Sequence, residues 1–266
     1  MSRMVWIFVC AVLLSAAAAS IILRPAPPPN PSPVSPPPQP TLSPKPVSPP
    51  LDPAGQVPLI PSTWSIRYSP GMPANPSTAP SGGWVFSFPL AAPGVCPAPP
   101  TTGPNFNIST CPHVDYVTAS YITPIVGSSL SMTFSIAVGP NTVFDYHTAA
   151  NNTCVSPANF RFMIEHMDDA GLYQPYYRWW SHDISYRLQP TNGSLTLTVP
   201  LTPDQWSSVL GEIGNASAAA AAGFADTLKN VGLIGMTFGG GCFAGHGVYL
   251  NSGNATFTVT DFRIIP

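Results

Sequence analysis

The densest group of side chains with binding chemistry lies in the segment LYQPYYRWWSHDISYRL, residues 172–188. Aromatic rings on a rigid strand can stack on the apolar faces of sugar rings, while neighbouring polar side chains bind the hydroxyl groups. If one unbroken strand runs through the segment, alternation places Tyr177, Trp179, Asp183 and Arg187 on one polar face. We predict that these four residues bind a ligand; the alternative is that the aromatic rings belong to the core.

A second group of ionisable residues, Glu165, His166, Asp168 and Asp169, follows a predicted strand. Paired carboxylates can act as acid and base in glycoside hydrolysis, and adjacent aspartates can supply oxygen ligands to calcium. The spacing matches no defined catalytic motif, so we interpret the group as a solvated turn. We therefore predict no catalytic residue and no cofactor, with a structural calcium ion as the alternative.

Four cysteines remain once Cys10, inside an N-terminal apolar run, is set aside: Cys96, Cys111, Cys154 and Cys242. An even number of cysteines in an exported chain predicts two disulfides. Sequence alone leaves all three pairings open. The loop of proline, glycine and asparagine between Cys96 and Cys111 favours a bridge that closes it, which leaves Cys154 to pair with Cys242.

The glycine-rich segment GGGCFAGHG, residues 239–247, places Cys242 and His246 at a spacing that suits metal ligands. A zinc site that also uses His147 and Cys154 is therefore an alternative to the disulfides. Oxidation outside the cytoplasm competes with thiolate ligation, so we predict no metal here. No helix is predicted after the glycines, which argues against phosphate binding and favours a tight loop between strands.

The charge of the chain excludes one class of partner. Lys and Arg number 9, Asp and Glu number 11, and charged residues make up only 8% of the sequence. Such a balance offers no surface for a polyanion, so nucleic acid is not an expected partner. The minimum motifs of serine hydrolases, zinc proteases and P-loop nucleotide hydrolases are also missing from the sequence.

The N-terminus has the pattern of an export signal. Arg3 precedes an apolar run over residues 5–23 that contains several small residues suited to a cleavage site. The run is also close to the length of a spanning helix, so an uncleaved anchor is the alternative, and the membrane is a partner only in that case. We predict that residues 1–24 are a signal peptide or an anchor and that the rest is extracytoplasmic, secreted or periplasmic.

A proline-rich spacer follows over residues 25–61, which hold 17 of the 36 prolines. Proline fixes φ and removes backbone donors, so this stretch favours polyproline II over helix or sheet. Such a spacer would hold a folded domain away from a membrane or wall.

Residues 62–266 are predicted to form one all-β domain, an antiparallel β-sandwich of jelly-roll type. Apolar and polar residues alternate through most of the predicted strands, which cover residues 64–68, 84–88, 116–122, 130–138, 160–164, 176–188, 195–199, 231–238, 247–250 and 255–264. In the last strand the apolar residues change parity, which predicts a β-bulge near Thr260 or Asp261.

A small helical insertion interrupts the strands. Thr202 and Gln205 match a capping box around Pro203, and Asn215 can cap the alanine-rich stretch that runs to Lys229. We predict a hairpin of two helices that covers one end or edge of the sandwich.

Several segments, YYRWWS, LTVPLTPDQWSSVLG, VGLIGMTFGGGCFAGHGV and ATFTVTDFRI, resemble a group of uncharacterised exported bacterial β-sandwich proteins. The closing strands more distantly resemble the galactose-binding-like jelly rolls of carbohydrate-binding modules. This resemblance covers about residues 84–264 and implies the fold, but no residue of a known sugar site maps onto the chain.

We hypothesise an exported, non-catalytic β-sandwich that binds a glycan or cell-envelope polysaccharide through an aromatic and polar patch. Two alternatives stay open: a polysaccharide-cleaving enzyme that uses Glu165 or His166, and a structural or protein-binding envelope protein.

Overall fold

The structure is a computed structural model that describes residues 55–69, 71, 74–91, 111–147, 156–169, 174–182, 184–240 and 246–266. The predicted signal segment, residues 1–24, and most of the proline-rich spacer lie outside these residues. Within the described ranges, no helix has both the length and the apolar character needed to cross a membrane.

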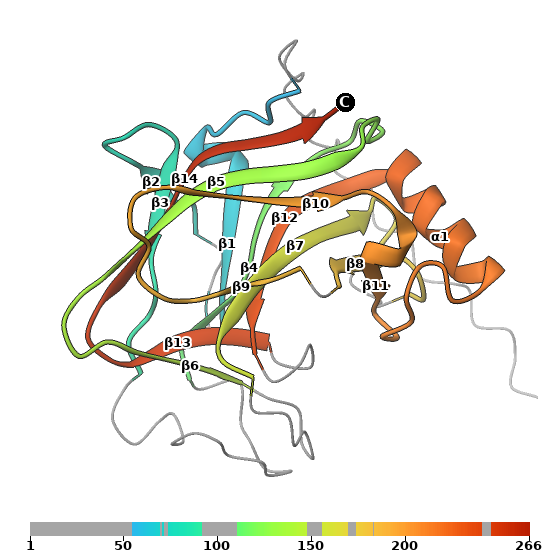
Figure 1. Ribbon diagram of the computed structural model, residues 1–266. Coiled ribbons are helices and arrows are strands. Elements are labelled where there is room, and N and C mark those ends of the chain that lie inside the picture. The colour runs from blue at the N-terminus through green and yellow to red at the C-terminus, as the bar shows by residue number, and fades with distance from the viewer. Residues whose placement is uncertain are drawn as a thin grey trace, which may run out of the picture. The chain divides into compact units, whose positions relative to one another are not determined.

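Two antiparallel β-sheets form the sandwich, which confirms the predicted fold class (Figure 1). The large sheet consists of β1(Trp64–Ser69), β4(His113–Ser120), β6(Val143–His147), β7(Asn159–His166), β8(Arg178–Ser181), β9(Tyr186–Arg187), β11(Trp206–Ser208), β12(Val231–Gly239) and β13(His246–Ser252). The small sheet consists of β2(Ser77–Thr78), β3(Trp84–Ser87), β5(Ser129–Val138), β10(Leu195–Pro200) and β14(Ala255–Ile265).

The strand order explains which parts of the chain meet. The large sheet runs β11-β8-β7-β12-β4-β13-β6, with β1 paired to β4 and β9 paired to β7. The small sheet runs β10-β5-β14-β3-β2. Strands distant in sequence therefore lie side by side, and any site on the face of the large sheet combines residues from both halves of the domain.

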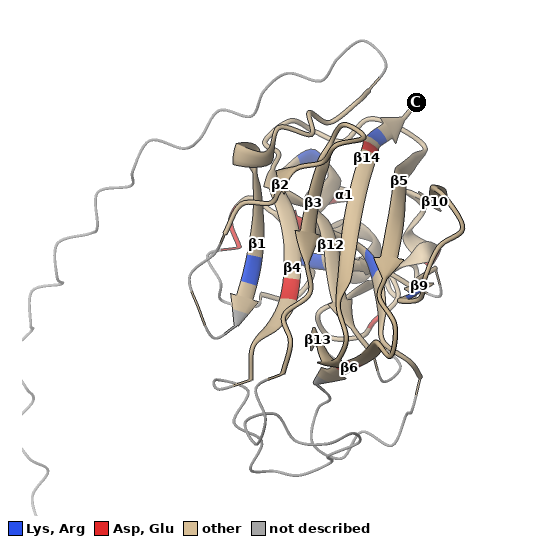
Figure 2. Ribbon diagram, turned by 90° about the vertical axis from the view of Figure 1, so that its left-hand side faces the viewer, with Lys and Arg blue, Asp and Glu red and all other residues tan. Residues whose placement is uncertain are grey.

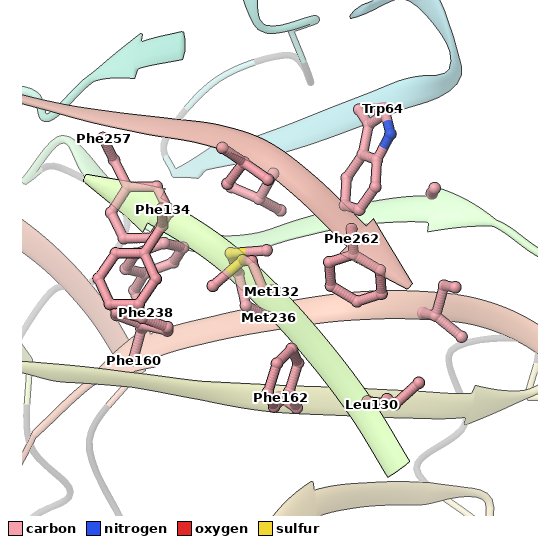
Figure 3. Packing of buried hydrophobic residues seen from close by; sticks show 14 of the residues in the cluster. Trp64, Leu130, Met132, Phe134, Phe160, Phe162, Met236, Phe238, Phe257 and Phe262 are labelled. Carbon is pink, nitrogen blue, oxygen red and sulfur yellow. The ribbon is translucent and has the colours of Figure 1, made fainter. Parts of the chain in front are cut away.

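Aromatic rings from both sheets fill the centre of the sandwich (Figure 3). Phe134 and Phe257 of the small sheet stack with ring centroids 5.5 Å apart, and Phe160 of the large sheet meets both rings edge-on at 5.0 Å. Phe238 of the large sheet packs on Phe257 at 5.5 Å. These offset and edge-to-face contacts are the arrangements that aromatic quadrupoles favour, and they fix the two sheets against each other.

The predicted β-bulge in the last strand is confirmed. Val259 of β14 pairs with Phe134 of β5, while Asp261 pairs with Thr133, so Thr260 has no partner in the ladder. The extra residue shifts the alternation by one position. Because of that shift, the apolar residues on both sides of the bulge face the core.

The helical insertion is smaller than predicted. The expected first helix is a single 3₁₀ turn, Pro203–Gln205, with no side-chain cap, and β11 follows it directly. The helix α1(Ala218–Lys229) begins after Ser217, whose hydroxyl accepts a hydrogen bond from the Ala220 amide at 3.1 Å. The prediction that Asn215 is the cap is wrong, because that residue lies two positions before the N-cap Ser217.

Residues at the end of the predicted spacer belong to the folded domain. Gln56 pairs with Arg263 of β14, and the Val57 amide donates to the Phe262 carbonyl at 2.8 Å. The Val57 side chain is buried in the core. The described fold therefore begins before residue 62.

Candidate functional site

The outer face of the large sheet, which points away from the sandwich, carries polar and charged side chains. On β7, Phe162 and Ile164 point into the core. Arg161, Met163 and Glu165 have the opposite parity, and Met163 belongs to a separate outer cluster. The outer face is thus a second surface with its own packing.

One row of residues crosses this face at right angles to the strands. The register of the pairs aligns Ser65 of β1, Thr118 of β4, Gly235 of β12, Met163 of β7 and Trp180 of β8. Glycine is the only one of these residues without a side chain. A Cβ atom at that position would lie 2.1 Å from a backbone carbonyl oxygen of β4, so the close approach of the two strands requires glycine.

A cleft with a volume of about 440 Å³ lies on this face, and its lining includes Thr118 and Met163, the two neighbours of Gly235 in the row. Residues of this row, residues of the two adjacent rows and Gly71 line the cleft: Ser65, Arg67, Gly71, Tyr116, Thr118, Met163, Glu165, Arg178 and Leu233. The volume lies within the range of roughly 300 to 1,000 Å³ that is usual for small-molecule sites. The lining combines hydroxyl groups, charged groups and apolar surface.

A buried ionic cluster forms one wall of the cleft. Glu165 and Arg178 are directly paired across β7 and β8, with Oε2 of the glutamate 3.1 Å from Nε of the arginine. The same Nε donates to the carboxylate of Asp169, whose side chain is fully buried. The cluster therefore holds two carboxyl groups around one guanidinium, and one of them faces the cleft.

Burial raises the pKa of the Glu165 carboxyl to about 7, and the charge of Asp169 acts in the same direction. The cations Arg178 and Arg67 oppose the rise without cancelling it. Near neutral pH this carboxyl is present in both protonation states. It can therefore donate or accept a hydrogen bond in the cleft.

The opposite rim carries an exposed cation. Arg67 projects from β1 with its Cζ atom 5.9 Å from the centroid of the Tyr116 ring. Its Nε atom is 4.0 Å from Oδ2 of Asp115 on β4, and the arginine side chain is 58% exposed. Figure 2 shows these opposite charges side by side on β1 and β4. Asp115 is itself held by His113, whose Nε2 lies 3.2 Å from Oδ1 of the aspartate.

The predicted exposure of Trp179 is wrong. Trp179 is directly opposite Ile164 on β7, and paired residues of an antiparallel ladder share a face, so both point into the core. The indole is fully buried and packs edge-on against Phe224 of α1. A side chain without exposed surface cannot stack on a ligand.

The other three predicted ligand residues do not complete a patch with it. Tyr177 is half-buried and stacks on the His166 ring at 4.3 Å. Arg187 is exposed on β9 and lines a different hollow of about 570 Å³, beside Asp145 and Tyr146. Asp183 lies outside the described residues. Neither Tyr177 nor Arg187 lines the cleft on the outer face, so their predicted role stays a prediction.

The four ionisable residues at the end of β7 and just after it point to different places. Glu165 faces the cleft, while His166 is buried with Nε2 3.4 Å from a carboxylate oxygen of Asp226 on α1. Asp168 has a mostly exposed side chain, and Asp169 is bound by Arg178. The two aspartates therefore do not share one coordination site. The described ranges contain no group of three or more His, Cys, Asp or Glu side chains that could hold a metal ion.

Of the predicted disulfide cysteines, Cys111 is described, and it is buried and disulfide-bonded. Cys96, Cys154 and Cys242 lie outside the described residues, so the proposed pairing stays a prediction. Of the zinc alternative, the structure gives the backbone pairing of His147 with His246 across β6 and β13. Both of its cysteines lie outside the described ranges.

Sequence reasoning missed most residues of the cleft, because they come from strands far apart in the chain. Signals were present nonetheless. Ser65 and Arg67 alternate with buried apolar residues on β1, and Tyr116 and Thr118 do the same on β4. Gly235 stands inside an apolar strand, where glycine indicates a close approach of another backbone or of a ligand.

The chain matches no family model, and no curated protein matches it. Among solved structures, it is similar to a protein described as "xylan-binding module CBM15", with 11% sequence identity over 75% of this chain and 88% of the other. The TM-score is 0.32. A likeness at this level carries no argument about a site or a ligand.

Proposed function

We propose that the chain is an exported protein whose β-sandwich binds a glycan, such as a cell-envelope polysaccharide, without cleaving it. The observation that carries the proposal is the cleft of about 440 Å³ on the outer face of the large sheet. Export is supported by the apolar N-terminal run behind Arg3. The binding site differs from the patch predicted around Trp179, whose indole lies in the core.

The lining of the cleft fits the chemistry of a sugar. A pyranose presents hydroxyl groups around its edge and apolar C–H groups on its faces. Arg67 and Glu165 are planar groups that can bind adjacent hydroxyls, and Thr118 offers a further hydroxyl. Met163 and Leu233 supply apolar contact surface.

Binding without cleavage is favoured by the carboxylates of the site. Glycoside hydrolases commonly use two carboxyl groups that flank the scissile bond. Among the described residues that line the cleft, Glu165 is the only carboxylate. Asp169 is fully buried and bound by Arg178, so it cannot reach a substrate.

A polysaccharide-cleaving enzyme is the second candidate, and one observation favours it. A pKa of about 7 would suit Glu165 to general-acid catalysis at neutral pH. This candidate predicts product release from a polysaccharide that disappears in Glu165→Gln. Binding without product release argues for the first candidate.

The test of the proposed function is retention of the full chain on a panel of neutral and acidic polysaccharides, compared with a variant whose cleft is filled. Ser65→Tyr places a ring into the cleft from the edge strand β1, where the serine is only half-buried. Ser77→Tyr is the matched control, because Ser77 is exposed on β2, an edge strand of the small sheet.

We expect one class of polysaccharide to retain the wild type and Ser77→Tyr at least ten times more strongly than Ser65→Tyr. Equal retention of the two variants would exclude the cleft as the binding site. If no polysaccharide retains the wild type, the third hypothesis, a structural or protein-binding envelope protein, replaces this one.

A further inference from the structure

Building on the proposed function, we infer that the glycan bound in the cleft is acidic, a uronate-containing polysaccharide, and that Arg67 binds its carboxylate. The inference rests on the position and the partners of this arginine and on the arrangement of the other charges of the cleft. A neutral sugar has no charged group for Arg67 to bind.

Arg67 is the cation of the cleft that is available to a ligand. Its side chain is 58% exposed and stands on an edge strand over the Tyr116 ring. Within the described part of the chain its one ion contact, to Asp115, is long at 4.0 Å, and its guanidinium donates no hydrogen bond. A guanidinium fork matches the two oxygens of a carboxylate, which makes arginine the preferred side chain for carboxylate recognition.

The second arginine of the cleft, Arg178, is not available to a ligand in the same way. Arg178 is buried, and its Nε atom is shared by Glu165 and Asp169. Its charge is thus matched by the chain's own carboxylates. One exposed cation on the rim, beside a wall whose guanidinium is already bound by two carboxyl groups, suits a ligand with one carboxylate per bound sugar.

The wall also limits the repulsion that an acidic ligand would meet. Arg178 from β8, Asp169 from the loop after β7 and Arg67 from β1 are the charged groups that act on Glu165. The effects of these charges and of burial together give the Glu165 carboxyl a pKa of about 7. The carboxyl is therefore mostly protonated at pH 6 and mostly ionised above pH 8. The affinity for an acidic glycan should therefore fall as the pH rises through this range, whereas the affinity for a neutral glycan should not.

The test compares three acidic polysaccharides with their own carboxyl-reduced forms, which keep the sugar scaffold and lose the charge. Polygalacturonate, alginate and glucuronoxylan are titrated with the full chain at pH 6. We expect at least one acid to bind about tenfold or more tightly than its reduced form, the ratio of a charge-assisted hydrogen bond to a neutral one.

Arg67→Gln should remove this preference. Because Arg67 lowers the pKa of Glu165, the variant should also show its pH dependence at higher pH. Arg263→Gln is the matched control, since Arg263 is a partly exposed arginine on β14 of the small sheet. That variant should bind like the wild type.

The outcomes separate the two proposals. If the reduced forms bind as well as the acids, or if Arg67→Gln keeps the preference, the inference is overturned while glycan binding stands. If neither these polysaccharides nor the neutral panel binds, the proposed function fails together with the inference.

Discussion

Replacing Trp179 by alanine should lower the free energy of unfolding of the domain substantially. The variant is therefore a test of packing and not of ligand binding. The indole is fully buried, meets Phe224 edge-on at 5.1 Å and stacks over Tyr176 at 6.0 Å. Its Nε1 donates to the Tyr176 carbonyl at 2.8 Å and contacts the Thr227 hydroxyl at 3.2 Å. The side chain thus joins β8 to α1 and to the turn before β8.

The expected cost follows from these contacts. Truncation of a buried tryptophan to alanine removes its transfer free energy and leaves a cavity, together about 3 to 5 kcal/mol. The Tyr176 carbonyl keeps a second donor, the Thr227 hydroxyl at 2.9 Å, so little is added for an unsatisfied acceptor. Trp179→Phe keeps an aromatic ring and should cost about 1 to 2 kcal/mol.

Urea unfolding of the full chain without reducing agent, followed by far-UV circular dichroism, measures these differences in the free energy of unfolding, provided that the slope with urea is unchanged. Leu210→Ala is the control, because Leu210 is 62% exposed and its truncation should change the free energy of unfolding by less than about 0.5 kcal/mol. A loss below about 1 kcal/mol in Trp179→Ala would refute the reasoning. It would mean that β8 is shifted by one residue, so that the indole lies on the outer face of the large sheet.

Two further perturbations test the local chemistry. Folding raises the pKa of Glu165 from 4.5 to about 7, so the folded state binds this proton more tightly than the unfolded state. The resulting stabilisation is complete below pH 4.5 and is lost as the pH rises through 7. Urea unfolding should show a wild-type loss on the order of 2 kcal/mol over that range that Glu165→Gln lacks, and parallel pH profiles would contradict the raised pKa. Ser217→Ala removes the cap of the Ala220 amide and should cost about 1 kcal/mol, whereas Asn215→Ala should be nearly neutral. Equal costs for these two alanine variants would show that the helix begins elsewhere.

The strands could be predicted because most of them lie between one apolar and one polar environment. In β14 even the bulge was readable, since the buried residues Val259 and Phe262 have opposite parity and both must reach the same core. When one face of a strand packs on the core, few registers place all its apolar residues on that face.

The segment over residues 176–188 could not be resolved in this way. The chain leaves β8 after Ser181, where the Ser181 hydroxyl donates to the Ile184 carbonyl at 2.8 Å, and β9 begins at Tyr186. Which tryptophan of β8 turns inward is decided by its register with β7 and by the cover from α1, and neither is a local property. Both faces of β8 are buried, so alternation of polarity carries no signal there.

The cleft was hidden from the sequence for a related reason. Its row of residues draws on five strands, and Thr118 and Gly235 come within reach of each other only through the pairing of β4 with β12. No spacing along the chain encodes such a row. Gly235 and the alternating polar residues could be recognised in the sequence, but the sequence did not show that they lie next to one another.

Gly235 has a consequence for how the specificity of the cleft can change. It lies between Thr118 and Met163, two residues of the lining, and a Cβ atom there would collide with β4, so a substitution at Gly235 would have to move strands. The rim is easier to vary. Ser65 and Arg67 are the rim residues on an edge strand, where replacements disturb the sheet least. A library randomised at these two positions should therefore yield variants with new sugar preferences on an unchanged scaffold, and related chains should diverge there first.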